Sequence, residues 1–140
     1  MKLAILVVAA ALYDRDGRVL IAERPAGKHM AGRWEFPGGK VNAGEPEADA
    51  LARELREELG IEVTSSHPFM RLAHSYEDRN VELSMWIVEG FAGEPRGLDG
   101  QRFKWVHPER LVDEDILEAD HPFVEALCER QCTMREKPHT

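Results

Sequence analysis

The sequence predicts an α/β fold in which two helices cover the two faces of a mixed β-sheet. Segments with strand patterns are interleaved with two separated helical segments, at 46–59 and 122–130, and such interleaving is typical of layered α/β domains. The chain has 140 residues, enough for one hydrophobic core and short for two. We therefore expect a single domain over 1–140, although the pattern alone does not separate α/β from α+β.

Composition and charge narrow the class of protein. Hydrophobic residues make up 43% and charged residues 31% of the chain, as in ordinary packed domains and unlike disordered ones. The formal net charge of −8 argues against a nucleic-acid polymer or an anionic membrane as a partner. Cys128 and Cys132 lie four residues apart. We interpret them as reduced thiols, which suits a cytoplasmic protein.

The chain begins with an apolar run at 3–12 behind Lys2, which imitates a secretory signal. We interpret the run as a strand, because it is too short to span a bilayer. It also leads directly into a polar turn at 13–17 and a second strand at 18–23, the pattern of a β-hairpin.

Further strands and a helical turn are expected downstream, each bounded by glycine, proline or polar residues. The strands lie at 34–36, 62–64, 69–76, 81–91 and 103–106, and the helical turn lies at 107–111. We place a turn at Ser65–Ser66. Leu83, Met85 and Ile87 should share one face of the longest strand, and the last helix should bury Phe123, Leu127 and Cys128.

The helix between Gly38 and Ile61 has recognisable ends. Pro46 suits the first helical position, which makes Glu45 the expected N-cap and Gly60 the residue just past the C-terminus. At about 100° per residue, five apolar residues form one stripe that should face the core. They are Ala48, Leu51, Ala52, Leu55 and Leu59.

Three glutamates, Glu54, Glu57 and Glu58, occupy positions i, i+3 and i+4 beside that apolar stripe. At ~6 Å and an effective dielectric constant of ~20, each like-charged pair costs on the order of 3 kcal/mol. A hard divalent cation bound by carboxylate oxygens would offset this repulsion. The alternative is a solvated acidic face of the helix.

The spacing of residues 39–61 resembles the signature of the Nudix hydrolases. The matching positions are Gly39, Glu45, Arg53, Glu54, Leu55, Glu57, Glu58, Gly60 and Ile61. The resemblance implies the Nudix fold, an α/β/α sandwich around a mixed β-sheet. It also implies a loop–helix–loop that holds magnesium or manganese and hydrolyses a diphosphate linked to another group.

The same resemblance implies roles for individual residues. Glu54, Glu57 and Glu58 would be metal ligands, with the Gly38 carbonyl as a further ligand. Arg53 would orient a catalytic carboxylate, and Glu45 would support it or cap the helix. The attacking water would be activated by the metal and by a carboxylate, for which Glu54, Glu58 and Asp99 are all open.

Within the family, the chain is similar to the MutT branch and to relatives that act on cytidine triphosphates. This similarity implies a small nucleoside triphosphate as substrate. Arg24 would contact its phosphate or base, or is a plain surface arginine. Phe36 would line the nucleotide pocket, or is a plain core aromatic. Asp99 would bring a further carboxylate to the metal, or is a turn aspartate.

Asp120 is the informative departure from the MutT branch. MutT enzymes specific for oxidised guanine have an asparagine here, whereas an ionised aspartate only accepts hydrogen bonds. Asp120 therefore suits an amino group, such as that of cytosine or of guanine, and it could equally cap the last helix. Both 8-oxo-dGTP and a cytidine-type triphosphate stay open as substrates.

Two other functions stay open, as does the oligomeric state. The chain could hydrolyse another nucleoside diphosphate derivative, or it could be a non-catalytic module that senses a nucleotide. The three retained glutamates argue against the sensor. The sequence does not separate a monomer from a homodimer.

Overall fold

The N-terminal apolar run forms an inner strand of a mixed sheet. The structure, a computed structural model, describes residues 3–25, 27 and 30–136. The four-stranded sheet has the order β4-β1-β6-β5, in which β1 pairs in parallel with β6 and the other neighbours are antiparallel. The strands are β1 (Leu3–Leu12), β4 (Gly38–Lys40), β5 (Glu62–Ser75) and β6 (Arg79–Ala92). The predicted mixed sheet is therefore confirmed.

A second, antiparallel sheet, which the sequence analysis did not predict, lies beside the first. It has the order β3-β2-β7, with β2 (Val19–Glu23) between β3 (Trp34–Glu35) and β7 (Phe103–Val106). Its strands come from distant parts of the chain, so periodicity could predict each strand but not their pairing. This sheet positions the segments around Arg24 and Phe36.

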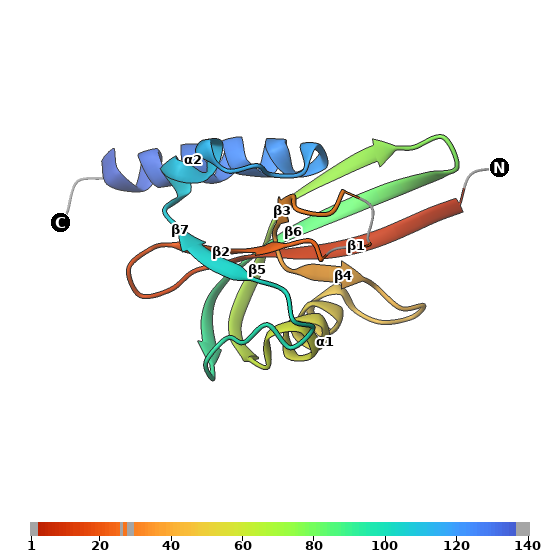
Figure 1. Cartoon of the computed structure of the whole chain (residues 1–140), viewed down its shortest axis with the longest axis horizontal. Helices are drawn as coiled ribbons and strands as arrows, with labels where there is room; N and C mark the ends of the chain where they lie inside the picture. The colour runs from red at the N-terminus through yellow and green to blue at the C-terminus, as the bar shows by residue number, and fades with distance from the viewer. Residues whose placement is uncertain (1–2, 26, 28–29, 137–140) are drawn as a thin grey trace.

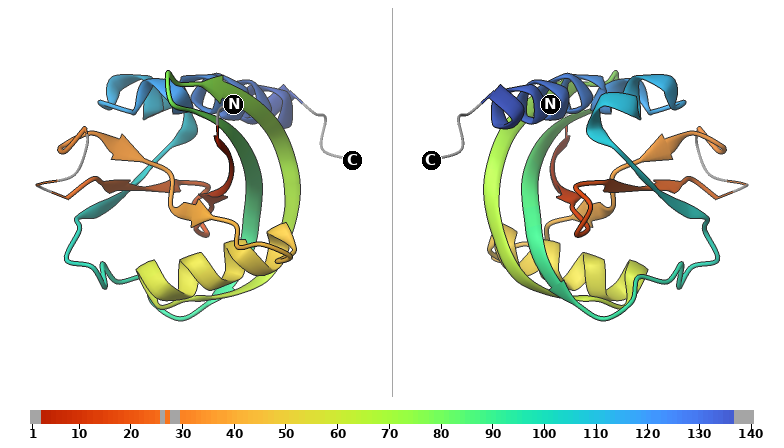
Figure 2. Two further views of the ribbon diagram at one scale, coloured as in Figure 1. Left: turned by 90° about the vertical axis from the view of Figure 1, so that its right-hand side faces the viewer. Right: turned by 90° about the vertical axis from the view of Figure 1, so that its left-hand side faces the viewer.

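Two helices enclose the strands, α1 (Glu47–Leu59) on one side and α2 (His121–Glu136) on the other (Figures 1 and 2). Short 3-10 helices, η1 (Pro108–Asp113) and η2 (Glu118–Asp120), precede α2. The side chains of β1 alternate between two buried apolar clusters, one packed on α1 and one on α2. The predicted layering, with a helix on each side, is confirmed, and Leu83, Met85 and Ile87 share the α2 side.

The ends and the buried face of α1 differ in part from the prediction. Pro46, with extended backbone at ψ 146°, is the N-cap, so Glu45 does not cap the helix. Gly60 ends it in the left-handed conformation at φ 70°, as predicted. Ala48 is exposed, Ala52 is only half-buried, and Ala50 is buried instead.

Three other predictions are corrected. The turn expected at Ser65–Ser66 is absent, and β5 runs through this point with shifts of register. A sheet edge tolerates such bulges, and also Pro68. Helix α2 is longer than 122–130, and Val124 rather than the half-buried Cys128 completes its buried face. The glycine-rich β4 was too short to be recognised as a strand.

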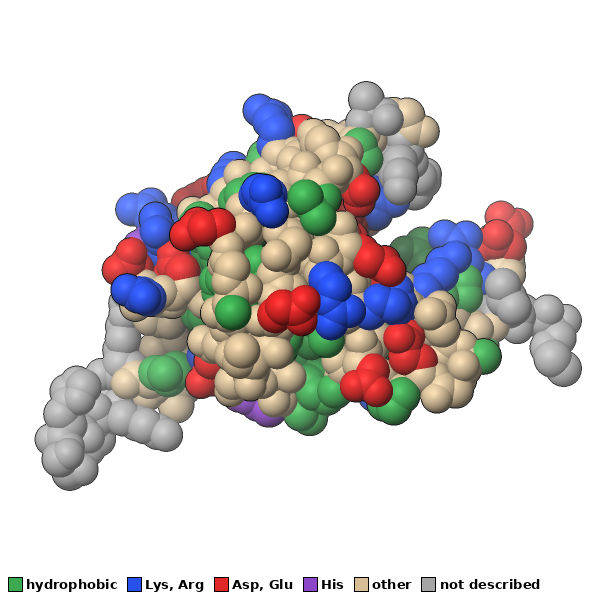
Figure 3. Space-filling view, turned by 90° about the horizontal axis from the view of Figure 1, so that it is seen from below, with side chains coloured by type: hydrophobic (Ala, Val, Ile, Leu, Met, Phe, Trp, Pro, Cys, Tyr) green, Lys and Arg blue, Asp and Glu red, His purple; other side chains and the backbone are tan. Residues whose placement is uncertain are grey.

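The surface of the α1 side carries acidic and basic side chains interspersed with one another (Figure 3). No helix in the described part of the chain is both long enough and apolar enough to cross a membrane.

Candidate active site

Two glycines of β4 lie in close contacts, Gly38 against the backbone of β1 and Gly39 against helix α1. Gly38 and Gly39 pair with Ala9 and Val8 of β1. A Cβ atom on Gly38 would lie 2.0 Å from the Val8 carbonyl oxygen, and one on Gly39 would lie 2.4 Å from the carboxyl carbon of Glu54. No side chain fits at Gly38, and a side chain at Gly39 would displace the carboxylate of Glu54. The carboxylate of Glu54 therefore rests directly on the backbone of β4.

Glu58 lies against the same strand, in surroundings that disfavour its charged form. Its Oε2 accepts a hydrogen bond of 3.2 Å from the Gly38 N–H. Burial, together with the negative charges of Glu54, Glu35 and Asp99, raises the pKa of Glu58 to about 8, although the hydrogen bond from the Gly38 N–H opposes the shift. Burial likewise raises the pKa of Glu54. The carboxylates of the site carry more negative charge than the hydrogen-bond donors around them neutralise.

Arg53 ties the carboxylates of this region together. Its Nε and Nη2 donate to the two oxygens of Glu45 at 2.9 and 3.0 Å. Its Nη1 donates to Glu54 at 2.9 Å and Nη2 donates to the Lys40 carbonyl at 3.0 Å. Glu45 thus holds Arg53, and Arg53 fixes the orientation of Glu54. This geometry is compatible with the orienting role predicted for Arg53, which stays a prediction.

Glu57 lies at the rim of the site. Its side chain is 59% exposed and receives a hydrogen bond of 3.4 Å from Arg53. Within residues 3–25, 27 and 30–136, no three Asp, Glu, His or Cys side chains converge as a ready-made metal site. Of the predicted ligands, the structure brings Glu54, Glu58 and Gly38 together and leaves Glu57 outside. The atoms available as metal ligands are carboxylate and carbonyl oxygens, which hard divalent cations prefer.

A cleft beside Glu58, which we call the Asp99 cleft, has a volume of about 380 Å³. It is lined by Ala22, Glu23, Arg24, Pro25, Glu35, Pro37, Glu58, Leu59, Asp99 and Gln101. The Asp99 N–H donates to Gln101 Oε1 at 3.0 Å, which steadies the loop. Asp99 is thus brought to the same cleft as Glu58, as its predicted role requires.

A second cleft, the Asp120 cleft, has a volume of about 400 Å³. Arg24, Phe36 and Asp120, the three predicted substrate-binding residues, all line it. Asp120 is 8% exposed. Burial and, to a smaller extent, the charge of Glu35 raise its pKa to about 7, although a hydrogen bond from the Phe36 N–H opposes the shift. The other lining residues are Val7, Val8, Ala9, Glu35, Gly38, Gly39, Lys40, Tyr76, Val81, Leu83, Leu117 and Ala119.

Glu35 is a site residue to which the sequence analysis assigned no role. Together with Arg24 it lines both clefts, and it accepts a hydrogen bond of 2.8 Å from Arg24 Nη1. The two clefts therefore meet at this ion pair. The one signal in the sequence is a charged residue between two aromatic ones, Trp34 and Phe36.

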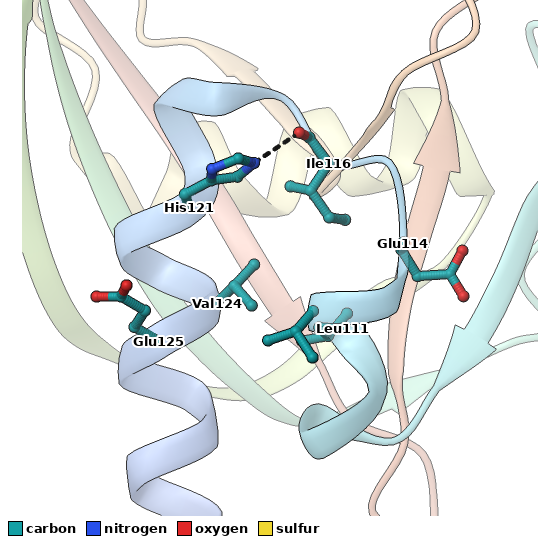
Figure 4. Close-up of a pocket in the computed structure, with 7 residues that line it drawn as sticks. Leu111, Glu114, Ile116, His121, Val124 and Glu125 are labelled. Carbon is teal, nitrogen blue, oxygen red and sulfur yellow. Dashed lines mark hydrogen bonds between the residues drawn. The ribbon is translucent and has the colours of Figure 1, made fainter.

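A smaller cleft of about 220 Å³ lies between η1 and α2 (Figure 4). His121 Nε2 is hydrogen-bonded to the Ile116 carbonyl at 2.9 Å. Glu114 and Glu125 point in opposite directions, away from the space between the two helices. The polar groups do not converge there, and no predicted site residue lines this cleft.

Comparisons with known proteins identify the family of the chain. The family model described as the NUDIX domain matches residues 8–126. A CTP pyrophosphohydrolase of Escherichia coli is 41% identical over 120 residues, which cover 86% of this chain and 89% of that protein. An 8-oxo-dGTP diphosphatase of Escherichia coli is 35% identical over 121 residues, which cover 86% of this chain and 94% of that one.

Solved structures show the same likeness. A MutT structure from a study of Aliivibrio salmonicida and Vibrio cholerae is 35% identical, with a TM-score of 0.81 over 91% of this chain and 98% of that one. The matches in sequence and in structure span nearly the whole of the relatives. The chain belongs to the Nudix family, among its MutT-like hydrolases.

Proposed function

We propose that this protein hydrolyses a nucleoside triphosphate, with Mg²⁺, to the nucleoside monophosphate and pyrophosphate. One observation carries the proposal. Two partly buried carboxylates, Glu54 and Glu58, have raised pKa values, and Glu58 lines a cleft that meets a second cleft at Arg24 and Glu35. Such a pair of clefts suits a substrate with a phosphate end and a base end.

Nudix hydrolases generally need a divalent metal ion, and the residues present fit one. Glu54, Glu58 and the Gly38 carbonyl would hold it, with Glu57 reaching in from the rim; Mn²⁺ could replace Mg²⁺ at such oxygen donors. When bound, the ion would neutralise phosphate charge and lower the pKa of a water molecule.

The chain's own residues would orient the reactants and move the proton. Arg53 holds the Glu54 carboxylate in one orientation, and Glu58 and Asp99 border the same cleft. One of these three carboxylates would take the proton of the attacking water. Arg24 would contact the substrate where the clefts meet, since a guanidinium binds phosphate in a directed way.

Asp120 would read the base in the second cleft, against the wall formed by Phe36. As a carboxylate it accepts from an amino group, which cytosine and guanine both carry. Its pKa is raised to about 7, so near neutral pH a protonated form that also donates is available. This dual capacity supports both a cytidine-type triphosphate and 8-oxo-dGTP, the substrates named for the two relatives.

We infer a cytoplasmic enzyme, monomeric or homodimeric, that acts on free nucleotides rather than on a nucleic-acid polymer. The net charge of −8 would repel a polymer, and the two cysteines are free thiols.

The test is phosphorus NMR of the products from CTP, 5-methyl-dCTP, dGTP and 8-oxo-dGTP with Mg²⁺. We expect pyrophosphate and a monophosphate, with the highest kcat/KM for one of the modified or cytidine nucleotides. Orthophosphate as product, or turnover only of other nucleoside diphosphate derivatives, would contradict the proposal. Tight binding of a nucleotide without any product would indicate a sensor.

A further inference from the structure

Helix α1 is anchored at its start by a polar cluster that lies away from both clefts. The carboxylate of Glu47, the first residue of α1, accepts hydrogen bonds from Ser84 Oγ at 2.5 Å and from Trp86 Nε1 at 3.4 Å. It also forms an ion pair with Arg71. Ser84 is 3% exposed and is, with Asp120, one of two buried polar residues among those the structure describes. The sequence analysis assigned no role to these residues.

The cluster and the candidate active site lie on one row of register partners, a line of paired residues that runs across the strands of the sheet. Arg71 of β5 is the register partner of Ser84 of β6. Ser84 in turn is the partner of Val8 of β1, and Val8 is the partner of Gly39 of β4. This row therefore crosses all four strands. Helix α1 touches it at both ends, through Glu47 on Ser84 and through Glu54 on Gly39.

The spacing of the helix matches the spacing of the sheet. Glu47 and Glu54 are seven residues apart, which is about 10.5 Å along a helix and close to two full turns, so both lie on one face. Ser84 and Gly39 are separated by two strand spacings, which is about 9.6 Å. Between these contacts Leu51 and Val8 belong to one apolar cluster.

Little else at the start of α1 fixes the position of the helix. Pro46, the N-cap, makes no side-chain capping hydrogen bond. The apolar contacts of the helix are non-directional, so they resist lifting of α1 off the sheet more than sliding along it. Buried polar clusters contribute more to a unique geometry than to net stability in several proteins. The cluster at Glu47 is placed to act in this way.

We propose that Glu47 is a positioning residue for catalysis. Its contacts with β5 and β6 set where α1 lies along the row, and so hold Glu54 on Gly39 and Glu58 on the Gly38 N–H. This inference rests on the proposed function of the two carboxylates, but it concerns a part of the protein that touches neither metal nor substrate.

The sharpest test compares Ser84→Val with Ser84→Thr, because valine and threonine have nearly the same shape and only threonine keeps the hydroxyl that donates to Glu47. We expect kcat of Ser84→Val to fall about tenfold below that of Ser84→Thr, with KM within about twofold, because a small misplacement of catalytic groups affects the rate more than binding. We also expect Mn²⁺ alone to bind Ser84→Val several-fold more weakly, measured by electron paramagnetic resonance titration.

Val124→Ala is the matched control, because it removes buried volume under α2 and leaves α1 untouched. It should lower Tm but keep the kcat and the Mn²⁺ affinity of the wild type. Equal kcat and Mn²⁺ affinity for the valine and threonine variants would overturn the proposal.

If Ser84→Val does not fold, the proposal can be tested with Glu47→Ala and Glu47→Gln, again by measuring kcat and Mn²⁺ affinity. Alanine should lose about tenfold in kcat, with glutamine in between, and wild-type values for both would refute the positioning role. The Mn²⁺ titration separates the two hypotheses. A wild-type protein that binds Mn²⁺ but turns over no triphosphate contradicts the proposed function, while the ranking of the variants in Mn²⁺ affinity still tests the positioning role.

Discussion

Among the four glutamates of helix α1, Glu47 at its start and Glu58 near its end have pKa values that are shifted in opposite directions. Hydrogen bonding from Ser84 lowers the pKa of Glu47, and Arg71 and Trp86 lower it further against the effect of burial. Burial and the neighbouring carboxylates together raise the pKa of Glu58 to about 8. Both residues face the same sheet from the same helix. What separates them is the set of donors and charges that the sheet presents to each.

From this difference we infer a structural role for Glu47, and it supports our proposal that Glu58 takes part in the reaction. Glu47 receives donors from two strands and is stable as an anion without any ligand. Glu58 has one backbone donor, the Gly38 N–H, and three acidic neighbours. An anion that is partly buried with few partners is costly. A bound cation would therefore stabilise ionised Glu58, whereas Glu47 already has its partners.

The largest expected effect is the loss of catalysis on substitution of Glu58. Glu58→Gln keeps the shape of the side chain and its bond from Gly38 but removes the charge, so we expect kcat to fall by about a hundredfold or more. Circular dichroism should show a folded protein. Glu57→Gln should behave in the same way if Glu57 joins the metal from the rim. Turnover close to wild type for both variants in Mg²⁺ would remove these residues from the active site.

A smaller effect is expected on the choice of base. Asp120→Asn replaces a group that at neutral pH is partly an acceptor-only carboxylate with one that always donates and accepts. We expect the ratio of kcat/KM for 8-oxo-dGTP over that for CTP to rise by about tenfold or more. An unchanged ratio would mean that Asp120 supports the cleft without reading the base.

The two glutamates should also give opposite pH dependences of stability. For Glu58 the folded pKa is raised to about 8, so its contribution to the metal-free protein is fully present below the unfolded pKa of about 4.5 and is lost as pH rises through 8. Glu58→Gln should therefore raise Tm at pH 8.5 by a few degrees, on the order of 1–2 kcal/mol. Millimolar Mg²⁺ should stabilise the wild type at this pH and the variant much less.

The smallest expected effect is on the free energy of unfolding, to which Glu47 contributes through its hydrogen bonds. The folded pKa of Glu47 is lowered, so its contribution is present above the unfolded pKa and is lost as pH falls through the folded value. We expect Glu47→Gln to cost about 1 kcal/mol in urea unfolding at pH 7 and less at pH 3. A cost that grows as the pH falls would contradict the assignment of Glu47 as a well-partnered anion.

The sequence predicted the features that depend on local spacing. The alternation of Leu83, Met85 and Ile87 and the glycine at the end of α1 come from short-range periodicity and chain stereochemistry. The glutamates of α1 could be grouped in the same way, because residues three and four apart in a helix are neighbours. Their assignment to a hydrolase required the resemblance to a known signature.

Features that depend on pairing over long distances could not be predicted from the pattern. The second sheet, the bulged course of β5 and the role of Glu35 arise from segments that meet only in the folded chain. Glu47 is the clearest case, since an acidic residue in the first turn of a helix suits the helix dipole anyway. Its partner Ser84 lies 37 residues away, and nothing in the local sequence marks the contact.

The most direct measurement is a carbon-13 NMR titration of the glutamate side-chain carboxyl groups in the metal-free protein and in the presence of Mg²⁺. Glu58 should titrate near pH 8 without metal and at much lower pH with Mg²⁺, while Glu47 should titrate below its ordinary range in both conditions. If Glu58 titrates at the ordinary glutamate pKa and does not respond to Mg²⁺, the strained carboxylate is not the metal-binding centre of this enzyme.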